Sequence, residues 1–358
     1  MPKKGRFLHH SYILMLKDFK FFVNEVRQKE QVFCVQNTIL LGFLGEWMDM
    51  KMIKIRFLEK REEAELPKWA KFLPKKGRKW YIEKRRPYCI RMEKEGLTAV
   101  LQTTSENSMT APWRKNGRKL LEQLKKEGAA IIIPPLEGEL PRDVLPFAEG
   151  KQLMTLFAFL GAEEVLKRQG KNPEECTYLL AGGNEEIWRS ALVSMGNEVN
   201  HLAIFTADVK GAEKLEQELF EERGLLTEVF ASPKNPVLSQ ADVVFCCGME
   251  QRKYEHMLKN NAVWIDLAGN RPVLRRLAER RQDVTVADGF FFARENRQMD
   301  GRWAEAEIFC SCESFRDCWK FSPAETKGKE ILCELKERGY AVSGFSFMGN
   351  RVKIQKKP

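Results

Sequence analysis

Two adjacent glycines, Gly182 and Gly183, stand between a short apolar run and an amphipathic segment. A glycine turn at the end of a strand lets the backbone approach a pyrophosphate closely, and the negative charge then rests on free N–H groups at the start of the next helix. Asn184 follows, and asparagine is a preferred helix cap. The chemistry predicted for Gly182, Gly183 and Asn184 is therefore contact with the pyrophosphate of NADP or NAD.

The residues after this turn depart from the pattern that a dinucleotide requires. A third glycine normally lets the helix pack closely on the strand, but this region holds Glu185, Glu186 and Trp188. The two carboxylates complement the helix dipole themselves and would repel a phosphate. The indole is far larger than the hydrogen of a glycine. We therefore expect these side chains to crowd the place of the diphosphate and to impair cofactor binding.

Further candidates for cofactor contacts follow later strands. Asp208 lies 26 residues after Gly182, near the position where an acid commonly holds the ribose hydroxyls, and the alternative role for Asp208 is a helix cap ahead of Gly211. Cys247 and Gly248 follow the predicted fourth strand. Open α/β sheets bind ligands at the carboxyl ends of their strands, so both residues are candidates for the cofactor site.

Two acids end later strands and face the same predicted crevice. Asp266 ends the fifth strand and Asp288 the sixth, so both are candidates for polar ligand contacts, with satisfied structural carboxylates as the alternative. Of Cys246 and Cys247, one thiol is expected to point into the crevice and the other into the core. A reactive thiol needs a lowered pKa, and no cation is adjacent in the sequence.

The elements that must position these residues alternate regularly in the second half of the chain. Apolar runs bounded by turn residues predict strands, and amphipathic stretches between them predict helices. This alternation predicts a Rossmann-like, doubly wound parallel sheet. The predicted strands cover residues 177–180, 202–205, 226–230, 241–245, 263–267 and 284–287, and the predicted helices cover 151–168, 185–195, 211–223 and 251–259.

A smaller α/β lobe is predicted before this sheet. A strand at 97–101, a helix at 112–126 and a strand at 129–133 form a βαβ unit, and 53–57 alternates like a half-buried strand. We divide the chain into an N-terminal lobe at 48–150, a Rossmann-like domain at 151–300, and helices and a tail at 301–358 that pack on the first lobe. Residues 1–47 have no clean period, and we interpret them as a mis-annotated extension from a gene start placed too early.

Composition limits the classes of function. The 358 residues include 43% hydrophobic and 31% charged residues with a net charge of +10, which is typical of a folded protein of two lobes. No apolar run approaches the roughly 18 residues of a membrane span, so we expect no membrane partner and a cytoplasmic protein. The nine cysteines show no spacing typical of a disulfide framework, which favours a reducing compartment. The chain has four histidines, which are few for a metal site.

A basic segment at 68–91 contains five aromatic residues, Trp69, Phe72, Trp80, Tyr81 and Tyr88. Cations that follow phosphates and rings that stack on bases would suit single-stranded nucleic acid. The alternative is a solvated face whose rings are core anchors beneath the lysine stems. We favour the second interpretation because no RNA-binding signature accompanies the charges.

The order of these elements resembles the long-chain acyl-acyl-carrier-protein reductases and, more loosely, shikimate dehydrogenase and glutamyl-tRNA reductase. The resemblance spans residues 111–345 and concerns order and pattern, notably at 130–133, 178–183, 240–244, 264–266, 286–289 and 303–316. It implies an NADPH-dependent reductase of a fatty acyl thioester that works through a cysteine thiolate. That cysteine lies two positions before an Ala-Glu pair, here Ala306-Glu307, so its place falls on Ala304. Cys310 lies six residues beyond Ala304 on the same predicted helix, about 240° around and 9 Å along, and cannot replace it.

Both the cofactor turn and the nucleophile are thus altered. The leading hypothesis is a degenerate NAD(P)-dependent-reductase-like protein that binds a small-molecule ligand or a protein partner. One alternative is an active NAD(P)H-dependent oxidoreductase on a small or acyl substrate, and another is nucleic-acid binding through residues 68–91. A homodimer is compatible with each of these hypotheses.

Overall fold

The computed structural model describes residues 52–59, 64, 66–85, 87–93, 96–107, 110–136, 138–248, 254–319 and 325–354. The chain divides into two compact units, Met1–Lys51 and Met52–Pro358, and all described residues belong to the second unit. The interpretation of residues 1–47 as an extension therefore lies outside the described residues.

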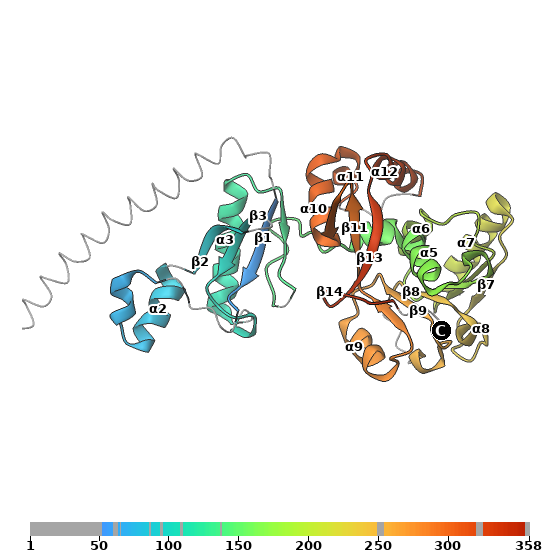
Figure 1. Ribbon diagram of the computed structural model, residues 1–358, viewed down its shortest axis with the longest axis horizontal. Helices are drawn as coiled ribbons and strands as arrows, with labels where there is room; N and C mark the ends of the chain where they lie inside the picture. The colour runs from blue at the N-terminus through green and yellow to red at the C-terminus, as the bar shows by residue number, and fades with distance from the viewer. Residues whose placement is uncertain are drawn as a thin grey trace, which may run out of the picture. The chain divides into compact units, whose positions relative to one another are not determined.

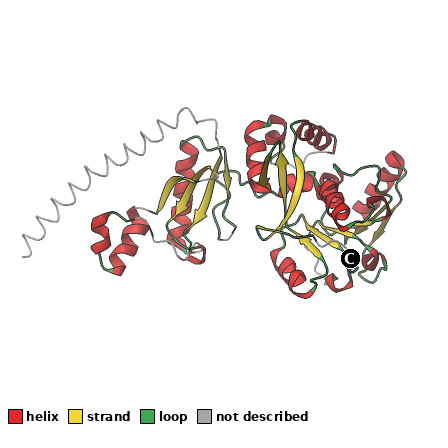
Figure 2. Cartoon of the chain, in the orientation of Figure 1, coloured by secondary structure: helices red, strands yellow, loops and turns green. Residues whose placement is uncertain are grey.

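The predicted Rossmann-like sheet is confirmed. Six strands pair in parallel in the order β10-β9-β8-β5-β6-β7. When β5 to β10 are numbered 1 to 6 along the chain and the sheet is read from the β7 edge, the order is 3-2-1-4-5-6, which is the Rossmann order. Figure 2 shows these strands and the helices between them. The strands are β5 (Thr177–Ala181), β6 (His201–Phe205), β7 (Thr227–Phe230), β8 (Val243–Cys246), β9 (Val263–Asp266) and β10 (Thr285–Ala287).

Both faces of this sheet are buried, which explains the continuous apolar runs of its strands. Successive side chains enter different cores: Leu180 and Phe245 belong to one cluster, and Leu179 and Val244 belong to the other. The helices that cover the sheet include α6 (Glu185–Leu192), α7 (Val209–Arg223), α8 (Val237–Gln240) and α9 (Arg271–Arg280). The helix predicted at 251–259 is wrong in its described part, where a 3-10 turn, η5 (Glu255–Met257), replaces it.

The smaller lobe has a four-stranded sheet in the order β2-β3-β1-β4. The predicted βαβ unit is present as β3, α3 and β4, and β1 lies between its two strands and is parallel to both. Leucines of α3 pack on β1 and β4 to form the core of the lobe. The elements are β1 (Met52–Phe57), η2 (Lys68–Phe72), α2 (Lys75–Arg85), β2 (Tyr88–Glu93), β3 (Gly96–Leu101), α3 (Ala111–Lys126) and β4 (Ile131–Ile133).

A third, antiparallel sheet follows the Rossmann strands and was not predicted from the sequence. Its strands pair in the order β12-β11-β13-β14, and α10 lies against β11 and β12 (Figure 1). The helix expected at 303–316 is two helices, because the chain is extended at Cys312. The elements are β11 (Gly289–Arg294), β12 (Arg297–Asp300), α10 (Gly301–Ser311), α11 (Glu313–Asp317), α12 (Glu325–Glu337), β13 (Ala341–Phe347) and β14 (Asn350–Arg351).

The connector predicted as one helix at 151–168 is broken at Phe157 into α4 (Lys151–Leu156) and α5 (Ala158–Gln169). Gly161 allows α5 to approach β11, because a Cβ at this position would lie 2.4 Å from Cζ of Phe290. This contact joins the antiparallel sheet to the largest hydrophobic core, which also contains Ile131 of the smaller lobe.

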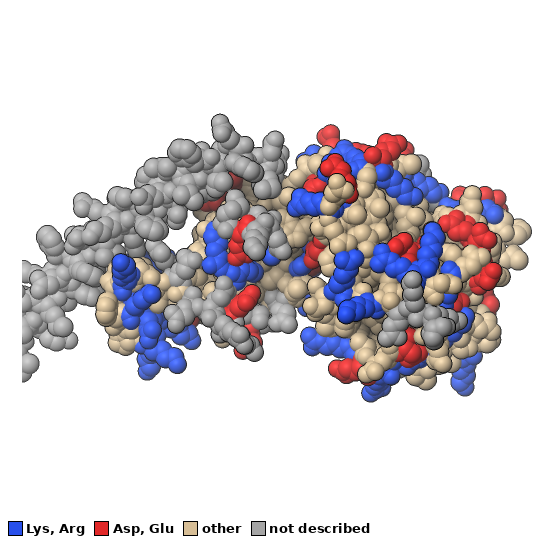
Figure 3. Space-filling view, in the orientation of Figure 1, with Lys and Arg blue, Asp and Glu red and all other residues tan. Residues whose placement is uncertain are grey.

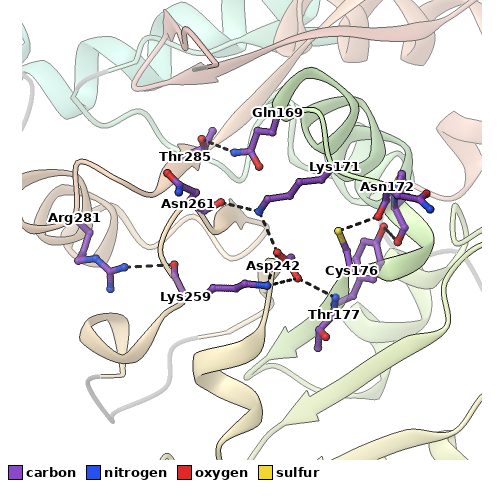
Figure 4. A network of polar contacts seen from close by, with 12 residues as sticks. Gln169, Lys171, Asn172, Cys176, Thr177, Asp242, Lys259, Asn261, Arg281 and Thr285 are labelled. Atoms are coloured by element: carbon purple, nitrogen blue, oxygen red, sulfur yellow. Dashed lines mark hydrogen bonds and ion pairs between the residues drawn. The ribbon is translucent and has the colours of Figure 1, made fainter. Parts of the chain in front are cut away.

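At the amino ends of the Rossmann strands, a charged network centres on the buried carboxylate of Asp242 (Figure 4). Lys171 and Lys259 donate to this carboxylate at 3.0 and 2.9 Å, and Lys171 also donates to the carbonyl of Asn261. Burial acts to raise the pKa of Asp242, but the two ammonium groups outweigh it and leave the pKa below its ordinary value. The network lies at the end of the strands opposite to the glycine turn, and Lys171 and Asn261 also line a cavity of about 600 Å³ there.

Among the described residues, no helix combines the length and apolar content that a membrane span requires. The same residues contain no group of three His, Cys, Asp or Glu side chains placed to hold a metal ion. The eight described cysteines are all free thiols.

Candidate functional site

The glycine turn after β5 has the backbone form that the sequence predicts. Gly182 and Gly183 have φ values of +71° and +82°, a region that glycine occupies without strain. The side chain of Asn184 accepts a hydrogen bond from the N–H of Ile187 and so caps α6. Gly183 and Asn184 are exposed, whereas Gly182 is buried and donates its N–H to the carbonyl of Phe205.

The loop after β8 packs directly on this turn. A Cβ at Gly248 would lie 2.3 Å from the backbone nitrogen of Gly183, and a Cβ at Gly183 would lie 2.8 Å from the carbonyl oxygen of Cys247. The structure therefore brings Gly183, Cys247 and Gly248 together, and both glycines are required for this close approach of two backbones.

Trp188 lies beneath the turn. Its side chain is fully buried in the largest core, and its Nε1–H donates to the carbonyl of Gly182 at 2.7 Å. The expectation that the indole crowds the place of the diphosphate is thus wrong, because the ring occupies space between helix and sheet. A buried indole still requires more room than the glycine that normally stands at this position.

The charge of Glu185 is compensated along the surface of α6 and α7. Its carboxylate pairs with Arg189 at 2.8 Å and with Lys214 at 3.7 Å, and Arg189 also pairs with Glu218. The hydrogen bond from Arg189 holds the pKa of Glu185 below its ordinary value. The repulsion of a phosphate by Glu185 is therefore weaker than the sequence alone suggests.

Asp208 caps α7. Its carboxylate accepts a hydrogen bond from the N–H of Gly211 at 3.2 Å, which is the alternative that the sequence left open for this residue. The capping bond occupies one of the oxygens that a ribose would need.

The two thiols after β8 are both buried, so the expectation that one of them points into an open crevice is wrong. Cys246 is 2% exposed and Cys247 is 4% exposed, and their side chains enter different cores. Burial raises the pKa of both thiols, and the neighbouring carboxylate of Asp266 raises that of Cys246 further. Neither thiol is suited to act as a nucleophile at neutral pH.

A cavity of about 680 Å³ opens at the carboxyl ends of β9 and β10, and we call it the carboxyl-end cavity. Charged side chains from several elements line it, among them Lys151, Asp266, Arg271, Asp288 and Arg302. The glycine turn does not line it. Six of its 24 lining residues are glycines, at positions 138, 150, 269, 289, 301 and 349.

Lys151 and Asp266 lie next to each other in the lining of this cavity. The ammonium group of Lys151 lies 3.8 Å from Oδ2 of Asp266 and donates to the backbone carbonyls of Asp266 and Asp288. The Asp266 side chain is fully buried, and among the described residues neither of its carboxylate oxygens has a partner in hydrogen-bonding geometry. Lys151 retains 27% of its side-chain exposure and so remains accessible from the cavity.

Burial raises the pKa of Asp266, and the carboxylate of Asp288 raises it further. The ammonium group of Lys151 and, more weakly, the backbone N–H of Asn270 and the thiol of Cys246 act in the opposite direction but do not outweigh burial. A buried acid with a raised pKa beside a cation, lining a cavity, is the arrangement expected of a binding or acid–base site. Asp288 differs, because its carboxylate accepts hydrogen bonds from the N–H of Met348 at 3.0 and 3.1 Å.

Lys151 is positioned by a buried carboxylate from α10. Glu305 accepts hydrogen bonds from the N–H groups of Gly150 and Leu153 at 2.8 and 3.0 Å, so it satisfies the first turn of α4. Gly150 has a φ of +79°, and a Cβ there would lie 3.2 Å from the backbone nitrogen of Arg302. Burial raises the pKa of Glu305 to about 7.

Sequence reasoning identified Asp266 and Asp288 but missed Lys151 and Glu305. The partners are far apart in the chain, since Lys151 and Asp266 are separated by 115 positions. Ala304, the place of the cysteine in the predicted resemblance, is fully buried, whereas Arg302 of the same helix lines the cavity.

No known family model matches this chain, and no curated protein matches it. Solved structures that resemble it include the L-tryptophan dehydrogenase of Nostoc punctiforme, at 14% identity over 81% of this chain and 84% of that one, with a TM-score of 0.32. The Δ1-pyrroline-2-carboxylate reductase of Thermococcus litoralis, in complex with NADH and L-proline, matches at 13% identity with a TM-score of 0.26. A shikimate 5-dehydrogenase-like protein matches at 16% identity over 54% of this chain and 65% of that one, with a TM-score of 0.27.

The match to the T. litoralis reductase covers 35% of this chain and 40% of that enzyme. The fold is established by the Rossmann strand order, and the finer resemblance to acyl-acyl-carrier-protein reductases stays a prediction.

Proposed function

We propose that this protein is a Rossmann oxidoreductase-like protein that binds a small polar molecule in the carboxyl-end cavity and has lost nicotinamide chemistry. The observation that carries the proposal is the fully buried Asp266, whose carboxylate has weak contacts with the backbone N–H of Asn270 and the thiol of Cys246 but no hydrogen bond of good geometry among the described residues. A buried polar group without a partner costs free energy, and a bound ligand that donates to it would offset this cost.

The turn after β5 supports the loss of nicotinamide binding. The residue that would hold the ribose, Asp208, already caps α7. Two glutamates, Glu185 and Glu186, stand in the first turn of α6 where a diphosphate would meet N–H groups. The residues present therefore do not fit a dinucleotide.

The spacing of Lys151 and Asp266 indicates the class of ligand. The ammonium group of Lys151 lies 3.8 Å from Oδ2 of the buried Asp266, so a ligand that reaches both groups when the Lys151 side chain moves aside must carry a donor and an acceptor on neighbouring atoms. An amine or hydroxyl next to a carboxylate meets this requirement, with the donor on Asp266 and the carboxylate on Lys151. L-Amino acids and 2-hydroxy acids are therefore the proposed classes, and the cavity of about 680 Å³ accommodates their side chains.

Thermal unfolding of the purified protein with L-amino acids and 2-hydroxy acids at millimolar concentration tests this function. At a hundredfold excess over the dissociation constant, a ligand should stabilise the protein by about 2.7 kcal/mol. The stabilisation should disappear in Lys151→Met. If no compound of either class raises the melting temperature, the proposal fails.

The second candidate is an active NAD(P)H-dependent oxidoreductase. Two observations favour it: the charge of Glu185 is compensated by Arg189 and Lys214, and Gly183 and Asn184 are exposed. Titration of NADPH and NADH by calorimetry separates the two candidates. Micromolar affinity would favour the oxidoreductase, whereas an absence of heat with retained binding of the small polar ligand would favour the first proposal.

A further inference from the structure

A dense positive surface lies on the smaller lobe, on η2 and α2, and we call residues 68–85 the basic surface (Figure 3). Eight cations in this stretch are all exposed, against a single carboxylate, Glu83, which lies 4.0 Å from the ammonium group of Lys79. The cations are Lys68, Lys71, Lys75, Lys76, Arg78, Lys79, Lys84 and Arg85.

Two aromatic rings of the basic surface face solvent. Phe72 is 89% exposed and Trp80 is 56% exposed, whereas Tyr81 is 4% exposed and meets Trp69 edge to face at 5.1 Å. The prediction that the rings are core anchors is therefore right for Tyr81 and wrong for Phe72 and Trp80.

Neither feature stabilises the isolated fold. Like charges at this density repel one another, and exposed rings forgo the free energy that burial would provide. The rings and charges alternate in the sequence, because Lys71 precedes Phe72 and Lys79 precedes Trp80. A ring next to an ammonium group is suited to a partner whose planar groups and negative charges also alternate.

We propose that the basic surface binds single-stranded nucleic acid without sequence preference, with bases stacked on Phe72 and Trp80 and phosphates held by the lysines beside them. An anionic membrane is the competing partner. The geometry favours nucleic acid because Tyr81 is buried and Ile82 is half-buried, so two separate rings offer little apolar area for insertion into a bilayer.

Fluorescence anisotropy of the full chain with a labelled single-stranded uridine oligonucleotide tests the proposal. If about five of the eight cations contact phosphates, affinity should fall about 100-fold between about 50 and 200 mM salt. Trp80→Ala should weaken binding about tenfold, because one stacking contact is lost. Phe220→Ala is the matched control, since Phe220 is a similarly exposed ring at 54%, on α7 of the Rossmann part, and this variant should bind like the wild type.

A pair of triple variants tests whether binding requires the positive charges of the basic surface. Lys75→Glu with Lys76→Glu and Lys79→Glu should abolish binding. Lys119→Glu with Lys210→Glu and Lys234→Glu makes the same change of net charge at exposed positions outside the basic surface and should bind within about threefold of the wild type. Equal losses in both triple variants would show that net charge alone acts, and this result would overturn the proposal.

Two further outcomes would also overturn it. One is an absence of binding at about 50 mM salt, where phosphate contacts are strongest. The other is co-sedimentation with phosphatidylserine vesicles but no affinity for the oligonucleotide, which would assign the basic surface to a membrane. All variants should keep the melting temperature of the wild type, because the substituted side chains are exposed, so that lost binding is not confused with lost folding.

Discussion

Asp266 is a residue that the fold retains at a cost. Its pKa is raised by burial above the ordinary value of 3.8, so its charged form is disfavoured in the folded protein. The folded state therefore holds the proton more tightly than the unfolded state, and stability is lost as pH rises above about 4. Retention of such a group at the centre of a cavity is a sign of function.

We expect Asp266→Asn to raise the free energy of unfolding at pH 7 by about 0.5–2 kcal/mol, the range for substitutions that relieve a costly functional group. The same variant should lose the ligand-induced stabilisation. Urea unfolding with and without ligand provides the measurement. Asp288→Ala is the control and should destabilise, because it removes the acceptor of the Met348 N–H. Equal effects of both variants would contradict this assignment.

At Trp188 the structure predicts a purely structural effect. Trp188→Phe removes the donor to the carbonyl of Gly182 and leaves part of the buried volume unfilled. The combined cost should be about 2–4 kcal/mol, since an unsatisfied buried acceptor and a small cavity each contribute. Urea unfolding measures it, and an unchanged midpoint would show that the indole does not support the turn.

At the scale of elements, the turn between β5 and α6 decides between the two candidate functions. Glu185 is already paired with Arg189 and Lys214, so its neutralisation should not open a site for phosphate. We expect Glu185→Gln with Glu186→Gln to gain no affinity for NADPH in calorimetric titration. Micromolar binding by this variant would show that charge alone blocks the turn.

The network at the amino ends of the strands should contribute strongly to stability. Asp242→Ala would remove the buried partner of Lys171, whose side chain is 12% exposed, and breaking this largely buried pair should cost about 3 kcal/mol. Asp283→Ala, which breaks the more exposed pair with Arg281, should cost at most about 1 kcal/mol. Thermal unfolding of the two variants side by side measures the difference, and similar melting temperatures would refute it.

Elements that are buried on both faces are the ones that sequence reasoning predicts well. The strand predicted at 263–267 is Val263–Asp266 in the structure, because its apolar run is continuous and bounded by polar residues. The antiparallel sheet was not predicted, because Phe290, Phe291 and Phe292 are all apolar although buried and half-buried positions alternate along this strand.

Site residues are predictable only where a local pattern marks them. Asp266 and Asp288 end apolar strands, and this position drew attention to them. Lys151 begins a helix like many other lysines, and its role arises from a contact across 115 positions. Glu305 acts on Lys151 through the backbone of α4, a relation that no spacing in the sequence reveals.

At the scale of the whole molecule, the buried carboxyl groups of Glu305 and Glu163 act on the pH dependence of stability in the same direction as Asp266. Burial raises the pKa of Glu305 to about 7, and burial together with a hydrogen bond to Glu198 raises that of Glu163 to about 7. The ordinary value of both is 4.5, so the stability that these groups contribute is lost as pH rises from about 4.5 to about 7. The pKa of Asp242 is lowered, so the stability that this carboxylate contributes changes only at a pH below this range.

The protein should therefore unfold with a free energy about 3 kcal/mol greater near pH 5 than near pH 8, from Glu305 alone. Urea unfolding across this range measures the effect. Glu305→Gln should flatten the pH dependence and lower stability near pH 5 by about 1–3 kcal/mol, because an amide offers one acceptor to two N–H groups. A wild-type stability that increases from pH 5 to pH 8 would contradict the burial of these acids.

The glycines around Lys151 and Asp266 have a consequence for how specificity can change. A quarter of the lining has no side chain, so much of the wall that a bound molecule would meet is peptide backbone. Mutation cannot trim such a wall, because there is nothing shorter than a hydrogen to substitute. Adding a methyl group is also disfavoured at these glycines, because Gly138, Gly150, Gly269 and Gly349 have positive φ values and a Cβ at Gly301 would lie 2.8 Å from the carbonyl oxygen of Phe290. The size of this chamber can therefore change only through the lining residues that carry side chains, such as Leu140 and Phe147.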